Sequence, residues 1–187
     1  MHYSQNNTIA NTTIMDNKIG IYPYLSQNNK VFFNNFINNT EHIVLEILIN
    51  LTYSISIFDI LASNIWMTTH NITYTYNGTT WTNMLGNYWD NYAGTDNDGD
   101  GIGDTPYEND TKPLIEPAWN YKIYDTDSDG VNDIIEEATV TNPLDNDTDD
   151  DGIPDGWELM YNFDPLDPAD ATIDLDGDNL SNLDEYM

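Results

Sequence analysis

Four times in its second half, this 187-residue chain repeats an Asp-x-Asp-x-Asp string that is followed by Gly or Asn and then by an aliphatic residue. The four strings begin at Asp96, Asp125, Asp147 and Asp174. Carboxylates crowded at alternate positions repel one another, since bringing two unit charges to about 4 Å costs roughly 4 kcal/mol at an effective dielectric constant near 20. A bound divalent cation reverses the sign of that interaction. We therefore expect these segments to fold around hard cations.

The spacing of oxygen donors matches what a calcium loop requires. Calcium takes about 6 to 8 oxygen ligands, which a loop supplies from positions 1, 3 and 5, the carbonyl of position 7, position 9 and a bidentate acid at position 12. The second and third loops offer a donor at every position. Their predicted ligands are Asp125, Asp127, Asp129, the Val131 carbonyl, Asp133 and Glu136, and then Asp147, Asp149, Asp151, the Ile153 carbonyl, Asp155 and Glu158.

The other two loops depart from this pattern. The fourth has Asn179 where the second and third have a turn glycine, and the first has Tyr107 at position 12, so its site is expected to be weaker or to borrow a ligand. The predicted ligands are Asp174, Asp176, Asp178, the Leu180 carbonyl, Asn182 and Glu185 in the fourth loop, and Asp96, Asp98, Asp100, the Ile102 carbonyl and Asp104 in the first. We expect about four calcium ions, with affinities in the extracellular range of roughly 10⁻⁴ to 10⁻³ M.

One detail separates these loops from calcium sensors of the EF-hand type. The aliphatic residue stands at position 7 of all four loops, while position 8 holds Gly103, Asn132, Pro154 and Ser181. An EF-hand pair uses an apolar position 8 to join its loops, and no long helix precedes any loop here. The pattern therefore favours a structural repeat over a switch that opens a hydrophobic groove. Solvated Asp-rich and Gly-rich turns without an ion are the alternative.

An offset of 22 residues relates two segments in the first part of the chain. It pairs Asn7 with Asn29, Ile9 with Val31, Ile14 with Phe36, Asn17 with Asn39, and Ile21 with Ile43. Short apolar triplets at such a period are typical of parallel β-helix coils, in which aliphatic side chains stack inward. Asn accepts the positive-φ turns and can form side-chain ladders along the coils. A generic Asn-rich β segment is the alternative.

The coils are followed by a segment that is rich in aromatic residues. A degenerate third coil is expected from Leu51 to Ile65, then a hairpin around Asn77-Gly78. Trp81, Tyr88, Trp89 and Tyr92 are expected to cover the open end of the coils. The predicted fold is mainly β. It consists of parallel β-helix coils over residues 1–66, a closing segment with the first calcium loop over 67–117, and loop-rich calcium-binding repeats with short helices over 118–187.

Composition excludes several partners. The formal net charge is −29, with four Lys and no Arg, so nucleic acid and anionic membrane surfaces are not expected to bind. The chain has no Cys, which removes thiolate sites. Its longest apolar stretch, Ile43 to Met67, is interrupted by polar residues and is a poor membrane span. The opening residues show no signal peptide, although the pattern is extracellular, so we expect a fragment of a longer surface protein.

The string GNYWDNYAGTDNDGDGIGDTPY resembles the closing segment of NosD-type right-handed parallel β-helix proteins, which are abundant among archaeal cell-surface proteins. That resemblance covers about residues 5 to 117. The remainder, from DTDSDGVNDIIEE onward, is similar to prokaryotic thrombospondin type 3 repeats. The second resemblance implies calcium held by aspartates on an extracellular stalk or adhesion module. Cell-surface glycans or neighbouring surface proteins would be its partners.

Three functions follow from these patterns. The first is a non-catalytic, calcium-stabilised surface module. The second is a carbohydrate-binding or carbohydrate-processing β-helix, with Trp81, Trp89 or Tyr92 as the sugar platform; hydrolysis would need a pair of acids. The third is the copper role linked to the NosD name, which His2, His42 and His70 do not support because they are scattered singly and copper favours clustered Cys, Met or His.

Overall fold

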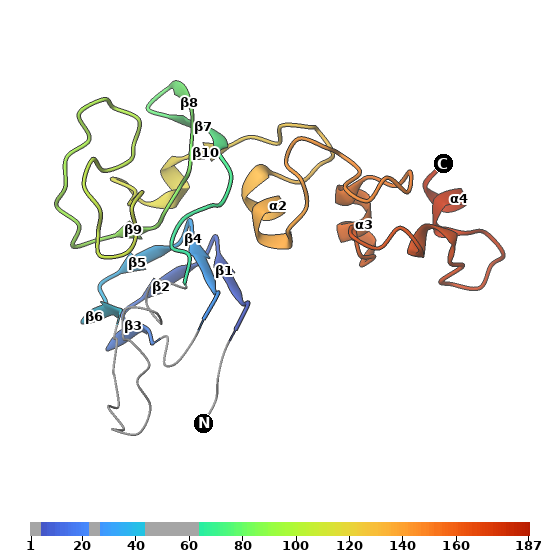
Figure 1. The fold of residues 1–187 in the computed structure, drawn as a ribbon, viewed down its shortest axis with the longest axis horizontal. Coiled ribbons are helices and arrows are strands. Elements are labelled where there is room, and N and C mark those ends of the chain that lie inside the picture. Colours follow the sequence, from blue (N-terminus) through green and yellow to red (C-terminus); the bar gives the residue numbers. More distant parts are fainter. Residues whose placement is uncertain (1–4, 23–26, 44–63) are drawn as a thin grey trace. The chain divides into compact units, whose positions relative to one another are not determined.

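The computed structural model describes residues 5–22, 27–43 and 64–187. The chain divides into two compact units, Met1–Lys122 and Ile123–Met187 (Figure 1). The described fold is mainly β with a few short helices, as expected from the sequence. The segments predicted as coils and as the closing segment fall together in the first unit, which also holds the first Asp-rich loop.

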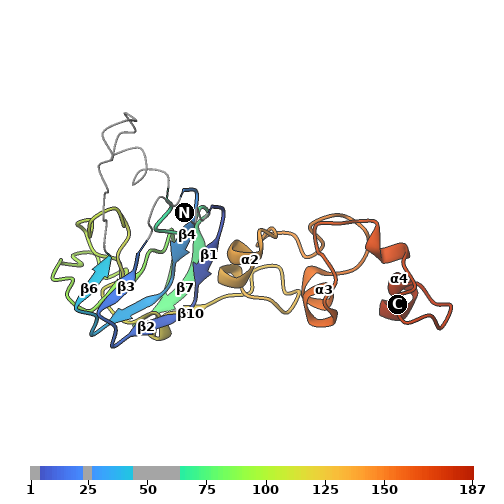
Figure 2. The ribbon, with the colours of Figure 1, turned by 90° about the horizontal axis from the view of Figure 1, so that it is seen from below.

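Six strands of three residues form two successive levels in the first unit. Strands of the second level pair in parallel with those of the first, and Figure 2 shows β1 beside β4 and β3 beside β6. The register joins Ile9 to Val31, Ile14 to Phe36 and Ile21 to Ile43, which confirms the predicted offset. The pairs are β1 (Thr8–Ala10) with β4 (Lys30–Phe32), β2 (Thr13–Met15) with β5 (Asn35–Ile37), and β3 (Ile19–Ile21) with β6 (Glu41–Ile43).

A third level is assembled from segments far apart in the sequence. Ile65 bridges Lys30 in parallel, and β9 (Tyr88–Trp89) pairs with β5 so that Trp89 lies opposite Phe36. Leu114 then bridges Tyr88 in parallel. The predicted third coil falls largely on residues 51–63, which lie outside the described residues. The level therefore contains a strand, β9, that the sequence pattern did not assign to it.

The segment between Ile65 and β9 contains the expected hairpin. β7 (Ile72–Tyr76) and β8 (Thr79–Asn83) pair antiparallel, with Tyr76 opposite Thr79. Asn77 has φ 47° and Gly78 has φ 80°, the two positive values that a type I′ turn requires. β10 (Lys122–Ile123) adds a third strand in the order β10-β7-β8.

Asparagine ladders connect the levels. The side-chain amide of Asn7 donates to the Asn29 side-chain oxygen at 2.9 Å, and Asn29 donates in the same way to Asn64 at 2.9 Å. In a second ladder, Asn34 donates to Asn87 at 3.0 Å. Each accepting side-chain oxygen also receives a backbone N–H from the level before it, so the ladders satisfy polar groups that the strands leave unpaired.

Aromatic rings fill the core where the third level lies. Trp89 stacks on Phe36 with ring centroids 4.2 Å apart, and Tyr107 also stacks on Trp89, at 5.0 Å. Tyr92 meets Tyr107 edge to face. Of the four aromatic residues predicted to cover the end of the coils, Trp89 belongs to this core and Tyr92 packs against it. Because Trp89 is completely buried, the expectation that its ring offers a sugar platform is wrong.

The second unit is built from acidic loops that run directly into short helices. α2 (Asp133–Thr139), α3 (Asp155–Tyr161) and α4 (Asn182–Tyr186) each begin at position 9 of a loop. The described residues also contain two 3₁₀ turns, η1 (Ala118–Asn120) in the first unit and η2 (Asp170–Thr172) in the second. Among the described residues, no helix combines the length and the apolar character needed to cross a lipid bilayer.

Candidate cation-binding loops

The four loops fold alike, although they lie in different units of the chain. The N–H of position 6 donates to the carboxylate of position 1 in every loop, which bends the chain back over its first aspartate. The pairs are Gly101 to Asp96 at 2.9 Å, Gly130 to Asp125 at 3.1 Å, Gly152 to Asp147 at 2.9 Å, and Asn179 to Asp174 at 2.9 Å. A second shared bond runs from the N–H of position 7 to the carboxylate of position 5, at 2.7 to 2.9 Å.

Position 6 needs a left-handed backbone in each loop. Gly130 and Gly152 have φ 103° and 97°, and Asn179 has φ 77°, so the predicted tolerance of Asn at this turn is confirmed. Position 4 is left-handed as well, which sequence reasoning missed. Ser128 and Asp150 occupy it with φ 69° and 61°, whereas the first and fourth loops have Gly99 and Gly177 there, and those glycines were the available signal of the turn.

Position 9 makes contacts other than those expected. The Asp133 carboxylate accepts the N–H and the hydroxyl of Thr126, both at 2.9 Å. Asp155 accepts the same groups of Thr148 at 2.8 and 2.6 Å, and Asp104 accepts the Asn97 N–H at 2.9 Å. These bonds tie position 9 to position 2 and thereby close the loop. Their further role as ligands of their own loops stays a prediction.

The predicted ligands at positions 1, 3 and 5 come together. In each of the first three loops, one carboxylate oxygen from each of the three aspartates lies within 4.8 Å of the others, as in the cluster of Asp125, Asp127 and Asp129. Burial and the neighbouring carboxylates raise the pKa of Asp149 to about 6. The loops thus concentrate negative charge where a cation would neutralise it.

In the second and third loops, the acid at position 12 is buried without a hydrogen-bond partner. Glu136 and Glu158 are completely buried, and neither carboxylate oxygen of either residue has a hydrogen-bond partner. Burial, and next the Asp127 and Asp129 carboxylates, raise the pKa of Glu136 to about 8. Burial, followed by Asp149 and Asp151, does the same for Glu158. Residues 123–187 contain no Lys, Arg or His, so this part of the chain supplies no cationic side chain to these acids.

The first and fourth loops are less enclosed. In the fourth, residues 174–180 and Glu185 are exposed, and the Asn182 side chain is buried while donating to the Asp170 carbonyl at 2.8 Å. In the first, Tyr107 packs against Trp89 instead of closing the loop. Asp100 is buried and accepts from Asn83 at 3.2 Å. The second and third loops are therefore the two that bury a position 12 acid.

Two further acidic clusters join a loop to the segment that follows it. One oxygen each from Asp129, Glu136 and Asp155 lie within 4.8 Å of one another, and so do oxygens of Asp151, Glu158 and Asp170. Asp170 belongs to η2 and to no Asp-rich loop, so the spacing of aspartates gave no sign of it.

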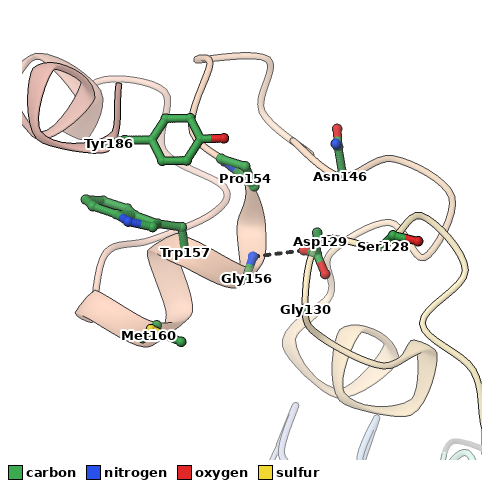
Figure 3. A pocket seen from close by; sticks show the side chains of 9 residues that line it. All are labelled: Ser128, Asp129, Gly130, Asn146, Pro154, Gly156, Trp157, Met160 and Tyr186. Carbon is green, nitrogen blue, oxygen red and sulfur yellow. Dashed lines mark hydrogen bonds between the residues drawn. The ribbon is translucent and has the colours of Figure 1, made fainter.

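A cavity of about 370 Å³ lies beside the first of these clusters (Figure 3). Trp157 and Tyr186 line one part of it, and Asp129 lines another. Gly156 also lines the cavity, and its N–H donates to the Asp129 carboxylate at 2.8 Å. The remaining lining residues are Ser128, Gly130, Asn146, Pro154 and Met160. The aromatic residues of the second unit were not singled out in the sequence.

The described histidines do not fit a copper site. His42 is buried, and its Nε2 lies 2.9 Å from an Asp90 carboxylate oxygen. Its Nδ1 lies 3.5 Å from the Asn39 amide nitrogen. His70 is exposed, His2 lies outside the described residues, and the chain has no Cys. The acidic clusters described above offer hard oxygen donors, which suit calcium-type ions better than copper.

Comparison with known proteins agrees with the fold of the first unit. The family model described as periplasmic copper-binding protein (NosD) matches residues 1–94. No curated protein and no solved structure matches the chain. The family match extends over the strand levels up to β9 and ends before the first Asp-rich loop. Since it spans half of the 187 residues, the chain belongs to the NosD family.

Proposed function

We propose that this protein is a non-catalytic, calcium-binding structural module on the outside of the cell. In this proposal, a short right-handed parallel β-helix forms the first unit and calcium-dependent repeats of the thrombospondin type 3 kind form the second. The observation that carries the proposal is the pair of buried glutamates. Glu136 and Glu158 have no partner for either oxygen, and an unpaired carboxylate in such a place is strongly unfavourable unless it is protonated or bound to a cation.

The donor set favours calcium over other metals. Every clustered side chain described above is a carboxylate, and hard oxygen donors suit calcium, magnesium and manganese. Flexible loops with many carboxylates and a position 12 glutamate suit the larger ion, since magnesium demands a near-ideal octahedron and keeps several waters. The absence of an apolar position 8 supports a structural role over a sensor role.

A place outside the cell fits the same chemistry. Extracellular calcium modules work with weak sites, because calcium is abundant there. The periplasmic description of the matching family model is compatible with export of this chain. Surface glycans or neighbouring surface proteins are the partners we propose for such a stalk.

Calorimetric titration of the full chain with CaCl₂ tests the proposal, with MgCl₂ as the comparison. We expect binding of more than one calcium ion, with no comparable response to magnesium at the same concentration. The variant Glu136→Gln, Glu158→Gln keeps the shape of both side chains and should lose the tighter part of the calcium response. Failure of the unmodified chain to bind calcium at millimolar concentration would remove the proposed function.

A further inference from the structure

We infer that each buried cation site of the second unit is completed by an aspartate from the segment that follows its loop, Asp155 for residues 125–136 and Asp170 for residues 147–158. The inference rests on the proposed calcium function and assigns ligands that the spacing of a single loop does not contain. It makes Asp170 a ligand and gives Asp155 a role in the loop that precedes its own.

The first closure joins the second loop to α3. Asp155 is the first residue of α3, and its carboxylate lies within 4.8 Å of those of Asp129 and Glu136. The next residue, Gly156, donates its N–H to Asp129 at 2.8 Å. A Cβ on Gly156 would lie 2.3 Å from the Asp129 carbonyl oxygen, so the helix approaches the loop more closely than any other residue would permit.

The second closure repeats this arrangement with a different sequence. Asp170 is the first residue of η2, and its carboxylate lies within 4.8 Å of those of Asp151 and Glu158. Asp170 thus stands toward the third loop as Asp155 stands toward the second.

Unpaired oxygens mark the second closure as a ligand site. Glu158 is completely buried with both oxygens unpartnered, and Asp151 Oδ2 and Asp170 Oδ1 are buried without partners too. The other Asp170 oxygen accepts the Asp164 N–H at 2.9 Å, which fixes the carboxylate in place. Asn182 Oδ1 is likewise buried and unpartnered, and its amide bonds to the Asp170 carbonyl. A cation satisfies such oxygens, whereas within the described residues no donor reaches them.

The two sites are thereby linked in series. The Asp155 carboxylate is held by Thr148 of the third loop and faces the acids of the second. A carboxylate has about four lone-pair positions, so two bonds to Thr148 leave it able to bind a cation. Ordering of the third loop by calcium therefore positions a ligand for the second. Filling the third site should raise the calcium affinity of the second.

Calcium titration of the isotopically labelled full chain, followed by NMR, resolves the individual loops. The Gly130 and Gly152 amides report on the second and third loops, since each donates to the first aspartate of its loop. In Asp170→Asn, we expect the calcium concentration at the midpoint of the Gly152 titration to rise at least about tenfold. Asp167→Asn is the matched control, because Asp167 is exposed and accepts from Ala169 in the same segment; its midpoint should not move.

The stability without calcium distinguishes a ligand from a merely structural residue. Asp170→Asn removes one charge from a cluster of like charges, so its melting temperature in EGTA should equal or exceed that of the unmodified chain, while its gain on adding calcium shrinks. A structural role would lower the melting temperature in both conditions. An unchanged Gly152 midpoint overturns the inference if the unmodified chain binds calcium; if that chain does not bind, the proposed function fails as well.

The serial link has its own test in Glu158→Gln. This residue contributes to the third site, yet the Gly130 midpoint of the second loop should rise by about fivefold or more, within the usual range of coupling between sites. A Gly130 midpoint equal to that of the unmodified chain would show that the loops bind independently.

Discussion

In the first unit, Asp110 stands at the end of an asparagine ladder. Its ionised side chain can only accept hydrogen bonds. Its carboxylate accepts the Asn87 N–H at 2.7 Å, the Trp89 indole N–H at 3.0 Å and the Lys112 N–H at 3.0 Å. Because the residue is buried, its pKa is raised to about 6 despite these donors. The aspartate thus offers two acceptor oxygens to these N–H donors, whereas an asparagine in its place would offer only one.

Replacing Asp110 should therefore destabilise the first unit. In Asp110→Ala, buried N–H groups lose their acceptor, and we expect a loss of about 3 to 5 kcal/mol in the free energy of unfolding. Urea denaturation followed by tryptophan fluorescence, to which buried Trp89 contributes, measures it. Glu41→Ala, at an exposed carboxylate on β6, is the control and should change stability by less than about 0.5 kcal/mol.

Loop position 6 yields a second prediction for single residues. Gly130 has φ 103°, and a Cβ there would meet no atom within 4 Å, so the cost of Gly130→Ala is that of the backbone alone. We expect a loss of about 1 to 2 kcal/mol in the calcium-loaded protein. Gly130→Asn introduces the residue that the fourth loop uses and should recover part of that loss. Equal stability of the two variants in thermal melts would contradict this account of the turn.

At the scale of elements, each loop of the second unit passes directly into a helix that carries its position 12 acid. The pKa of Glu136 and Glu158 is raised to about 8 in the folded chain without an ion, whereas an unfolded glutamate titrates near 4.3. The folded state therefore binds more protons than the unfolded state between these pH values. The stability that these protons provide is present below about pH 4 and is lost as pH rises toward 8.

In EGTA, the melting temperature of the second unit should consequently fall between about pH 5 and pH 8. With saturating calcium the trend should disappear or reverse, because the cation replaces the protons and binds better when the acids are ionised. Near-ultraviolet circular dichroism of Trp157 and its neighbours follows the transition. The variant Glu136→Gln, Glu158→Gln should flatten the pH dependence in EGTA; a variant that keeps the full slope would exclude these two acids as its source.

The elements that could be predicted from the sequence are those defined by local rules. The 22-residue register follows from like residues stacking on like, and the Asn77-Gly78 hairpin follows from turn chemistry. In each loop, the clustering of positions 1, 3 and 5 and the left-handed position 6 follow from nearby carboxylates and turn chemistry, whereas the left-handed position 4 was not predicted. The pairing of β9 and the clustering of Asp170 were not predicted, because each reaches its partner across an irregular stretch of chain that carries no period or motif.

At the scale of the whole molecule, the two units stabilise their buried polar groups in different ways. The first uses asparagine ladders and aromatic stacking, and those contacts need no ion. The second crowds carboxylates without a single cationic side chain, so its fold depends on what neutralises them. Calcium dependence should therefore be confined to residues 123–187 and to the first loop at 96–104.

Hydrogen–deuterium exchange of the full chain in calcium and in EGTA tests this central claim most directly. Peptides from α2 and α3 should be protected in calcium and exchange rapidly in EGTA, while peptides that contain β4, β5 and β9 should exchange equally in both. Identical exchange of α2 and α3 in the two conditions would contradict the account.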